Sequence, residues 1–231
     1  MKVLFFDSST EILIVGLAGQ DGQSPKITWR SEKTGLNHAQ KILRYIEELF
    51  DETHVAPAEL NALACTLGPG SFTGLRIGLC TAKGLAEGWG LPIVGISAFE
   101  AMARTAFFLE PSEQTLWLPV IDARKGRFYT QAFIAKGATL ESPLPPLDLT
   151  PDDFLARWQE RPVNFCGYQA ALLAEKLKDR WPTAWEVKPS SGWEAALGQL
   201  ALEALAAPPL GADAGPCYIR PSEAEENLRR A

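Results

Sequence analysis

A glycine-rich turn between an apolar run and a helical pattern is the feature of this sequence best suited to chemistry. Residues 68–78 have the sequence GPGSFTGLRIG. Such a turn exposes backbone N–H groups at the start of a helix, where phosphate is favoured. No Lys followed by Ser or Thr comes after the last glycine of the turn, so the pattern is not a P-loop. Gly68, Gly70 and Ser71 are candidates for phosphate binding, and a tight structural turn capped by Ser71 is the alternative.

A second polar cluster follows the first apolar run of the chain. Asp7 is followed by three residues with hydroxyl groups, Ser8, Ser9 and Thr10. Ligands of α/β folds lie at strand ends and in the turns that follow them, so these four residues are candidates for holding a metal-bound nucleotide. An aspartate that caps the turn through its own side chain is the alternative. Asp122 follows a later apolar run in the same way, and both interpretations apply to it.

Small residues recur every four positions in the helix that the glycine-rich turn begins. Gly74, Gly78 and Ala82 form a stripe without bulky side chains along one face. A glycine inside a helix costs about 1 kcal/mol against alanine, so two of them indicate a backbone that approaches something closely. That neighbour is either the protein's own sheet or a helix of another chain. His38, at the start of another helix, is interpreted as a capping or packing residue rather than a catalyst.

Composition limits the classes of function. The chain has 231 residues, of which 46% are hydrophobic, and a formal net charge of −6. This is enough apolar material for one large α/β unit or two small ones, and it excludes disorder for most of the chain. The acidic balance argues against a protein that coats nucleic acid alone, because that affinity comes from Lys and Arg at phosphates. Lys125 and Arg127, after Asp122, are too few for a nucleic-acid patch.

Cysteine usage and hydropathy indicate a cytoplasmic protein. The four cysteines lack the close spacing of zinc ligands, so no metal site is expected, and three lie in apolar runs typical of buried reduced thiols. No stretch approaches the roughly 20 apolar residues that span a bilayer, so no membrane partner is expected. The first apolar run meets Asp7 at once, which does not fit a signal peptide.

Apolar periodicity predicts an α/β layer structure in the first half of the chain. Short β-rich runs predict strands, and apolar residues three and four apart predict helices. The expected elements are strands at 3–6, 12–17, 26–30, 61–67 and 92–96, a helix that follows Asn37 as its N-cap, and a helix over 71–89. The first two strands are expected to form a hairpin, and the run at 61–67 is apolar throughout, as a strand covered on both faces should be.

A second unit begins near residue 100 and repeats the start of the first. A strand, an aspartate, a small turn and a strand occur around Asp122 as they do around Asp7, which is what a duplicated fold leaves. The expected elements are strands at 116–121, 127–134 and 163–167, a surface loop at 141–151, and helices at 169–180 and 193–205. The predicted lobes are therefore 1–99 and a smaller 100–193, with residues 194–231 expected to pack back on the first.

Six segments of the chain form a recognisable set. They are FFDSST (5–10), NH (37–38), GPGSFTGLRIG (68–78), VGIS (94–97), IDARKG (121–126) and YIRP (218–221). In this order, over essentially the whole chain, they resemble the bacterial TsaB (YeaZ) family. The block GPGSFTGLR is highly specific to it. The resemblance implies an α/β fold of the actin-like, sugar-kinase and Hsp70 (ASKHA) type, with two RNase H-like lobes whose mixed sheets are flanked by helices.

The resemblance implies a partner subunit for making threonylcarbamoyladenosine on tRNA. In this family the paralogue TsaD carries the transfer chemistry, with a metal held by an H-x-x-x-H motif after the strand expected here at 92–96. The corresponding residues of this chain are Ala98 and Met102, and neither binds a hard or borderline cation as histidine does. We therefore expect no catalytic residue and no metal, and a scaffold or activator subunit rather than an enzyme.

The resemblance also implies partners. They are TsaD, bound as a heterodimer through helices of the first lobe, TsaE as a nucleotide-hydrolysing third member, and a second copy of the chain when it is alone. The candidates for the partner interface are Gly74, Arg76, Gly78, Ala82 and His38. We expect tRNA to be bound only through the complex, and ATP or ADP only at the complex interface.

Two alternative functions stay open at this stage. One is an ATP-dependent transferase or kinase of the same fold that is active on its own, using Asp7 and the turn at 68–70. The other is a peptidase, which the sequence favours least because it shows no pair of a nucleophile and a base.

Overall fold

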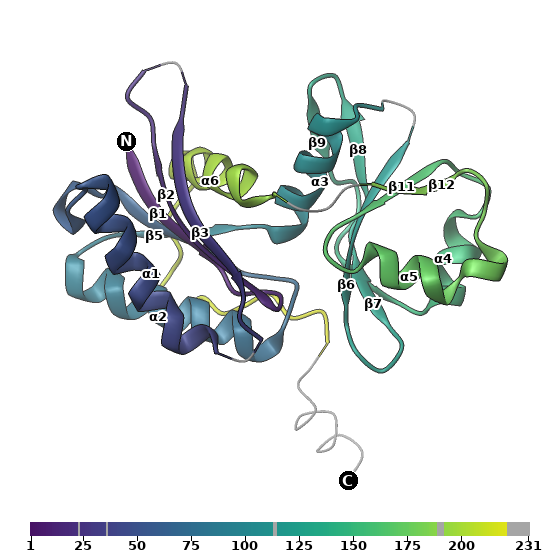
Figure 1. Cartoon of the computed structure of the whole chain (residues 1–231), viewed down its shortest axis with the longest axis horizontal. Coiled ribbons are helices and arrows are strands. Elements are labelled where there is room, and N and C mark those ends of the chain that lie inside the picture. The colour runs from purple at the N-terminus through teal and green to yellow at the C-terminus, as the bar shows by residue number, and fades with distance from the viewer. Residues whose placement is uncertain (23, 36, 113–114, 189–191, 221–231) are drawn as a thin grey trace, which may run out of the picture. The chain divides into compact units, whose positions relative to one another are not determined.

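The chain folds into two units, each built on a mixed β-sheet (Figure 1). The computed structural model describes residues 1–22, 24–35, 37–112, 115–188 and 192–220. Of the described residues, unit 1 comprises Met1–Ala98 and Glu194–Cys217, and unit 2 comprises those of Phe99–Trp193 and 218–220. Three chain crossings therefore join the units, after Ala98, after Trp193 and after Cys217.

The sheet of unit 1 has five strands in the order β3-β2-β1-β4-β5. They are β1 (Lys2–Asp7), β2 (Ile12–Gly19), β3 (Lys26–Lys33), β4 (Ala62–Thr66) and β5 (Ile93–Ile96). The first three are antiparallel neighbours, and β4 and β5 continue from β1 in parallel. All residues of β4 are buried, because a strand in the middle of a sheet with helices on both sides has no solvent face. All five strands occur where the sequence predicted them.

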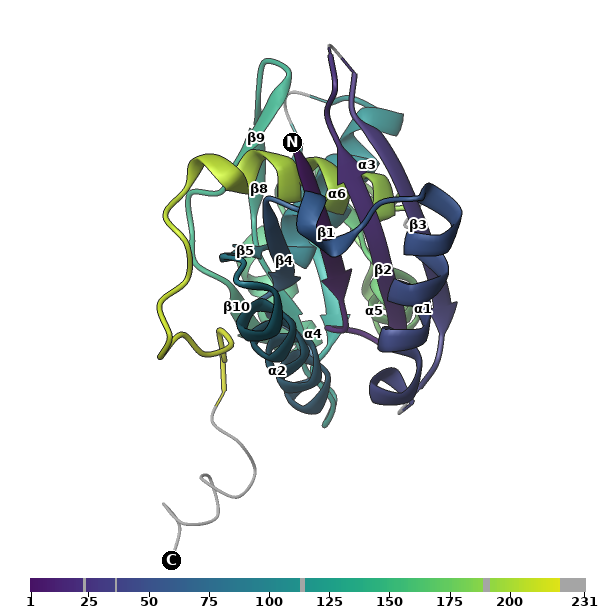
Figure 2. The same ribbon diagram turned by 90° about the vertical axis from the view of Figure 1, so that its left-hand side faces the viewer.

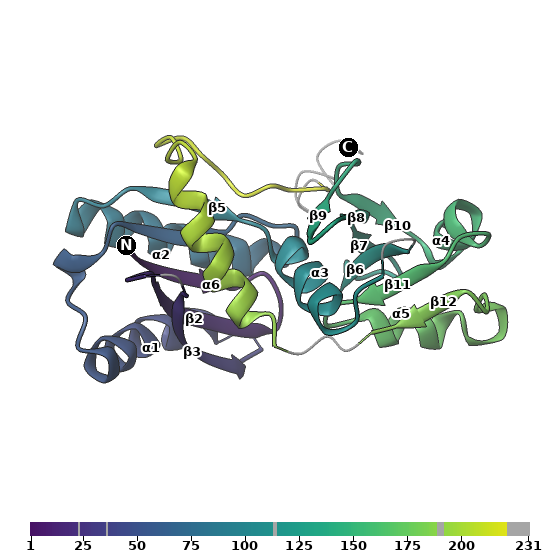
Figure 3. The same cartoon turned by 90° about the horizontal axis from the view of Figure 1, so that it is seen from above.

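Helices cover both faces of this sheet (Figure 2, Figure 3). On one face α1 (His38–Thr53) and α2 (Phe72–Trp89) share an apolar core with Leu4 and Phe6 of β1. On the other face α6 (Glu194–Glu203) packs so closely that a Cβ on its Gly198 would lie 2.6 Å from Ile27. The two helix starts differ: Ser71 caps α2 by accepting a hydrogen bond from Gly74 N (3.2 Å), whereas Asn37 at the N-cap of α1 makes no side-chain bond.

Unit 2 repeats this layout on a sheet of seven strands. They are β6 (Leu116–Asp122), β7 (Phe128–Thr130), β8 (Phe133–Lys136), β9 (Thr139–Glu141), β10 (Leu147–Leu149), β11 (Val163–Cys166) and β12 (Trp185–Val187). One face is covered by α4 (Pro151–Trp158) and α5 (Ala170–Lys176), whose apolar residues pack with Leu118 and Val120. Side chains alternate between the two faces of β6, and Trp117, on the face opposite to Leu118 and Val120, contacts Phe107 of α3 (Ala98–Leu109) with ring centroids 5.8 Å apart.

The strand predicted at 127–134 is interrupted in the structure. Both β7 and β8 pair with β6 in one antiparallel register, in which Val120 faces Thr130 and Trp117 faces Phe133. Continuing that register places Pro119 opposite Gln131, in the gap between the two strands. Because proline has no N–H to donate, it cannot complete the ladder there. The interruption is therefore caused by Pro119 in the paired strand β6, not by residues 127–134 themselves.

Other elements of unit 2 also differ from the prediction. The segment 141–151, predicted as a loop, contains β10, and Pro151 begins α4 rather than ending the loop. The helix predicted at 169–180 divides into α5 and a short 3-10 turn, Lys178–Arg180. Short edge strands with polar residues, such as β9 and β12, leave too weak a periodicity to predict.

The segment after α6 lies along unit 1 as far as Cys217. Leu210 N donates to Ile93 O (2.8 Å) at the β5 edge, and Cys217 N donates to Leu67 O (2.7 Å). Beyond it, Tyr218 and Arg220 belong to unit 2, where Arg220 pairs with Asp148 at 3.1 Å. The prediction that residues 194–231 pack on the first lobe is therefore wrong for 218–220, and residues 221–231 lie outside the described residues.

Exposure of the thiols differs from the sequence prediction. Cys65 and Cys166 are buried, but Cys80 on α2 and Cys217 are exposed, and all four are free thiols. Burial raises the pKa of the Cys65 thiol to about 12 and also raises the pKa of Cys166. Among the helices of the described residues, none combines the length and apolar character needed to cross a membrane.

Candidate functional site

Asp7 caps the turn that follows β1. Its carboxylate is fully buried, and Oδ1 accepts hydrogen bonds from Ser9 N (2.8 Å) and Thr66 Oγ1 (2.7 Å). The same bond recurs in unit 2, where Asp122 Oδ1 accepts from Arg124 N (2.8 Å). The structure thus supports the interpretation of both aspartates as turn caps, and the shared bond adds a geometric match to the repeat seen in the sequence.

The other polar residues of this turn pack against the glycine-rich turn. Ser8 Oγ donates to Gly74 O (2.8 Å), and Ser9 O accepts from Ser71 N (2.7 Å). A Cβ on Gly70 would lie less than 3.0 Å from the backbone of Ser9, so only glycine fits there. The two turns predicted as phosphate-binding candidates therefore lie side by side, but they pack directly against each other and occupy the space that a phosphate would need.

This packing does not suit a bound phosphate. Asp7, Ser8, Ser9 and Thr10 are all buried, with hydrogen bonds to groups of unit 1. Within the described chain Ser9 Oγ is the one side-chain oxygen of this turn without a hydrogen-bond partner. At the start of α2, Gly74 N and Leu75 N are bonded to Ser71. Gly68 is likewise closed in, because a Cβ there would lie 2.7 Å from Cys217 O.

The stripe of small residues on α2 faces the chain's own sheet. A Cβ on Gly74 would fall less than 3.0 Å from Ser8 O, and one on Gly78 would lie 2.5 Å from Ser8 Oγ. Ala82 is fully buried in the same core. The prediction that Gly74, Gly78 and Ala82 contact a partner is therefore wrong, because the two glycines permit the close approach of Ser8, directly after β1, and Ala82 is buried in the core of unit 1.

His38 is also a packing residue inside unit 1. Only 4% of it is exposed, and its ring bridges two segments: Nδ1 lies 2.6 Å from Thr34 Oγ1 and Nε2 lies 2.9 Å from Thr10 O. Both ring nitrogens are thus occupied, so His38 is not available at a surface. This corrects its assignment to the partner interface and agrees with the packing interpretation.

Arg76 is the one predicted interface residue that is exposed. It lies on the outer face of α2, with its guanidinium carbon 3.9 Å from the centroid of the Phe72 ring. The same face carries a second stripe of small residues four apart, Cys80, Gly84 and Gly88, all exposed. A Cβ on Gly84 or Gly88 would meet nothing within 4 Å.

Sequence reasoning missed this outer stripe although the signal was present. Leu75 and Leu79 are fully or nearly fully buried and lie on the same helix face as Gly78 and Ala82. Large apolar residues mark the core face of a helix, so they assign the first stripe to the sheet and leave Cys80, Gly84 and Gly88 to the outside.

The two positions that the family resemblance pairs with metal-binding histidines, Ala98 and Met102, are apolar and buried. Ala98 begins α3 and Met102 follows one turn later, and both are almost wholly inaccessible. Met102 packs beside Gly167, where a Cβ would lie 2.9 Å from its sulfur atom. Within the parts of the chain that the structure describes, no group of three or more His, Cys, Asp or Glu side chains could hold a metal ion.

Comparison with known proteins gives a consistent family. A family model described as TsaD, tRNA N6-adenosine threonylcarbamoyltransferase, matches residues 30–158. The tRNA threonylcarbamoyladenosine biosynthesis protein TsaB of Bacillus subtilis is 30% identical over 78% of this chain and 76% of its own length. The chain belongs to the TsaB (YeaZ) family. TsaB of Escherichia coli is 37% identical over 56% of this chain and 53% of its own length.

A solved structure confirms the fold of this chain. YeaZ from Pseudomonas aeruginosa matches with a TM-score of 0.74 over 94% of this chain and 100% of that one, at 24% identity. The match agrees with the fold expected from the resemblance, and the two mixed sheets flanked by helices show its α/β layers directly.

Proposed function

We propose that this TsaB-family chain is a non-catalytic subunit in the synthesis of threonylcarbamoyladenosine on tRNA, and that it supports a TsaD-type catalytic paralogue. Family membership supports the pathway. The observation that supports the non-catalytic role is the burial of Ala98 and Met102, the two positions at which the family resemblance implies the metal-binding histidines of the paralogue. An alanine and a buried thioether offer no ligand to a hard cation, so the transfer chemistry has to come from the partner.

The outer face of α2 is the surface proposed for the partner. Arg76, Cys80, Gly84 and Gly88 lie on it, and the three small residues allow a second helix to approach closely, since interaxial distance depends on the side chains at the contact. The same surface would pair two copies of the chain when no partner is present. Homodimer and heterodimer would then exclude one another.

A bulky substitution on this face tests the docking. Gly84→Arg adds a long side chain where a Cβ meets nothing, so the fold should persist while association with the TsaD-type paralogue is lost. Gly84→Ala is the matched control, because it changes the same position without bulk. Co-purification and sedimentation velocity measure both forms of pairing. Unchanged association of Gly84→Arg with the paralogue would overturn the docking surface.

Reconstitution tests the role itself. Threonylcarbamoylation of a tRNA transcript by the TsaD-type and TsaE-type proteins should need this chain, whereas the chain alone should transfer nothing. In the proposed assembly, ATP or ADP is held with residues of the partners, and tRNA is bound through the complex. Calorimetry of the chain alone with Mg-ATP should show no tight binding, and binding with turnover would favour the independent transferase instead.

A further inference from the structure

The turn between β6 and β7 has an unusual backbone for its residues. Three consecutive residues have positive φ: Arg124 (64°), Lys125 (54°) and Gly126 (73°). Arg127 N donates to Arg124 O (3.1 Å), which closes a turn whose two central residues are Lys125 and Gly126. Positive φ at both central positions defines a type I′ turn, which favours Asn, Asp and Gly. Gly126 fits this turn, but Arg124 and Lys125 carry side chains that make it less stable.

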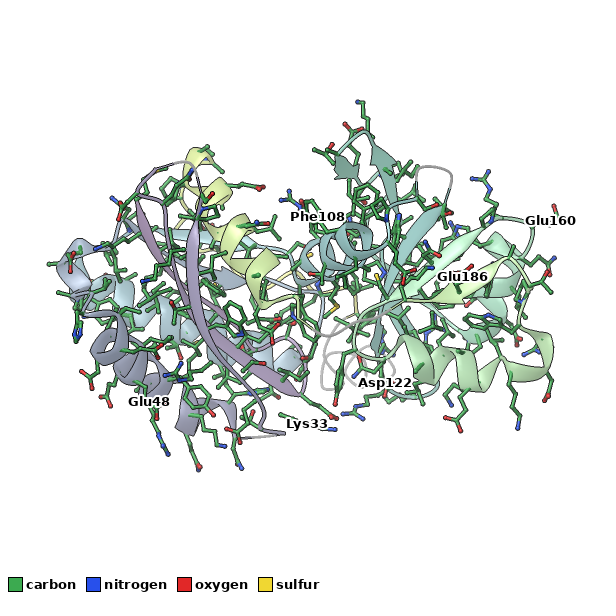
Figure 4. All side chains as sticks on the ribbon, turned by 45° about the horizontal axis from the view of Figure 1, so that its top comes forward. Lys33, Glu48, Phe108, Asp122, Glu160 and Glu186 are labelled. Carbon is green, nitrogen blue, oxygen red and sulfur yellow. The ribbon has the colours of Figure 1, made fainter. Side chains whose placement is uncertain are left out.

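The backbone holds two cations on the exposed tip of the hairpin. Lys125 is exposed, as is 73% of the Arg124 side chain, and a Cβ on Gly126 would meet nothing within 4 Å. Asp122, labelled in Figure 4 where the turn begins, fixes the backbone through its bond to Arg124 N. Its second carboxylate oxygen lies 3.6 Å from the Arg124 guanidinium, a weak exposed pairing.

Two more arginines lie at the base of the same turn. Arg127 and Arg220 contact opposite oxygens of Asp148, at 3.0 and 3.1 Å. Arg220 also donates to Ala123 O, directly before the tip, and its guanidinium carbon lies 5.4 Å from the centroid of the Tyr129 ring. The fold thus brings Arg220 to the turn, although it lies 97 positions after Ala123 in the sequence. Four cations of the described chain, two at the tip and two at the base, thus gather at this one turn, in a chain with a net charge of −6.

We propose that this turn contacts the phosphate backbone of the RNA substrate when the chain is in its complex, an inference that rests on the proposed function. Cations along an exposed rim suit a polyanion that passes over the surface, and Arg and Lys at phosphates supply the sequence-independent part of RNA affinity. Arg124 and Lys125 make the turn less stable than Asn or Gly would. The positive charge that they place at its tip explains why these residues occur there.

Binding of a tRNA transcript to the reconstituted complex tests the proposal. In Arg124→Asn/Lys125→Asn the charges are lost, but asparagine adopts this backbone more readily, so the fold should be kept. Fluorescence anisotropy between 50 and 200 mM salt should give a log–log slope shallower by about 2. Over that range the unmodified complex should lose about tenfold more affinity than the variant complex.

Controls separate charge from structure. Lys136→Asn/Arg180→Asn removes two exposed cations elsewhere in unit 2 and should leave the slope unchanged. Arg124→Lys/Lys125→Arg keeps the charge and should keep the affinity. The proposal is overturned if the asparagine pair binds RNA like the unmodified complex, or if the charge-keeping pair also loses affinity. Size-exclusion chromatography shows whether the complex has formed. If no complex forms, the proposed function fails; if the complex forms but the asparagine pair does not change RNA binding, only the RNA contact fails.

Discussion

Gly74 and Gly78 are needed in α2 because another part of the same chain packs against the helix at these positions. In an ordinary helix, alanine at such a position is favoured over glycine by about 1 kcal/mol. Here the missing Cβ makes room for Ser8, which also donates its hydroxyl hydrogen to Gly74 O. The cost of glycine is thus offset by the approach of α2 to the end of β1.

We predict that Gly74→Ala destabilises the protein although Gly84→Ala stabilises it. The added methyl group at Gly74 would press on Ser8 O, and such overpacking costs roughly 1–3 kcal/mol. At Gly84 the methyl group meets nothing, so the gain in helix propensity, up to about 1 kcal/mol, should remain. Urea unfolding of the two variants measures the difference. The same sign for both changes would contradict the close packing of α2 on Ser8.

His38 gives a second prediction about a single side chain. Replacing it by Phe fills the space but leaves Thr10 O and Thr34 Oγ1 without their partner, and each buried unsatisfied group costs about 1–3 kcal/mol. His54, exposed and with φ of 55° after α1, is the comparison site. His54→Gly should be neutral or stabilising in the same thermal unfolding assay, because glycine adopts this φ without strain. Equal melting temperatures for His38→Phe and the unmodified chain would disprove the packing role.

Secondary structure could be predicted where elements are long or their strands central, and less well elsewhere. The strands of unit 1 and the helices α1 and α2 carry strong apolar patterns, and Ser71 caps α2 as expected. The break between β7 and β8 was not predictable from its own residues, since it depends on Pro119 in the paired strand. The stripe of Gly74, Gly78 and Ala82 was recognised, but it was assigned to a partner chain instead of the protein's own sheet. Glycines at this spacing show that something approaches the helix closely, but they do not show which segment it is.

The start of α4 provides a prediction about pH. Thr150 and Asp153 form a reciprocal cap, and hydrogen bonds from Thr150 N and then Thr150 Oγ1 lower the pKa of the Asp153 carboxyl. A lowered pKa in the folded state stabilises the protein above the unfolded value, and that contribution is lost as the pH falls below about 4. Asp153→Asn should therefore reduce stability in urea unfolding at pH 7, and the difference should shrink in acid. A difference as large at pH 3 as at pH 7 would point to another cause.

The segment after α6 is held to unit 1 by a lysine on α2. Lys83 Nζ donates to Ala212 O and Ala214 O, both at 2.8 Å, and the segment covers the edge of β5 through Leu210. We predict that Lys83→Met increases hydrogen exchange at the amides of Leu210 and Cys217, whereas Lys176→Met in unit 2 does not. Mass spectrometry of exchanged peptides measures this. Unchanged protection of residues 210–217 would show that Lys83 does not hold the segment.

The molecule as a whole carries one buried thiol in each unit, and these report on how the units unfold. Cys65 lies in the core of unit 1 and Cys166 in unit 2, and burial raises the pKa of both, so neither presents a reactive thiolate in the folded state. At pH 8 the folded chain should therefore be alkylated at Cys80 and Cys217 alone. Because each unit has its own core, Cys65 and Cys166 should become reactive at different urea concentrations. Peptide mass spectrometry after brief labelling at each concentration resolves the two transitions. Coincident reactivity of Cys65 and Cys166 would instead show that the two cores unfold as one cooperative structure.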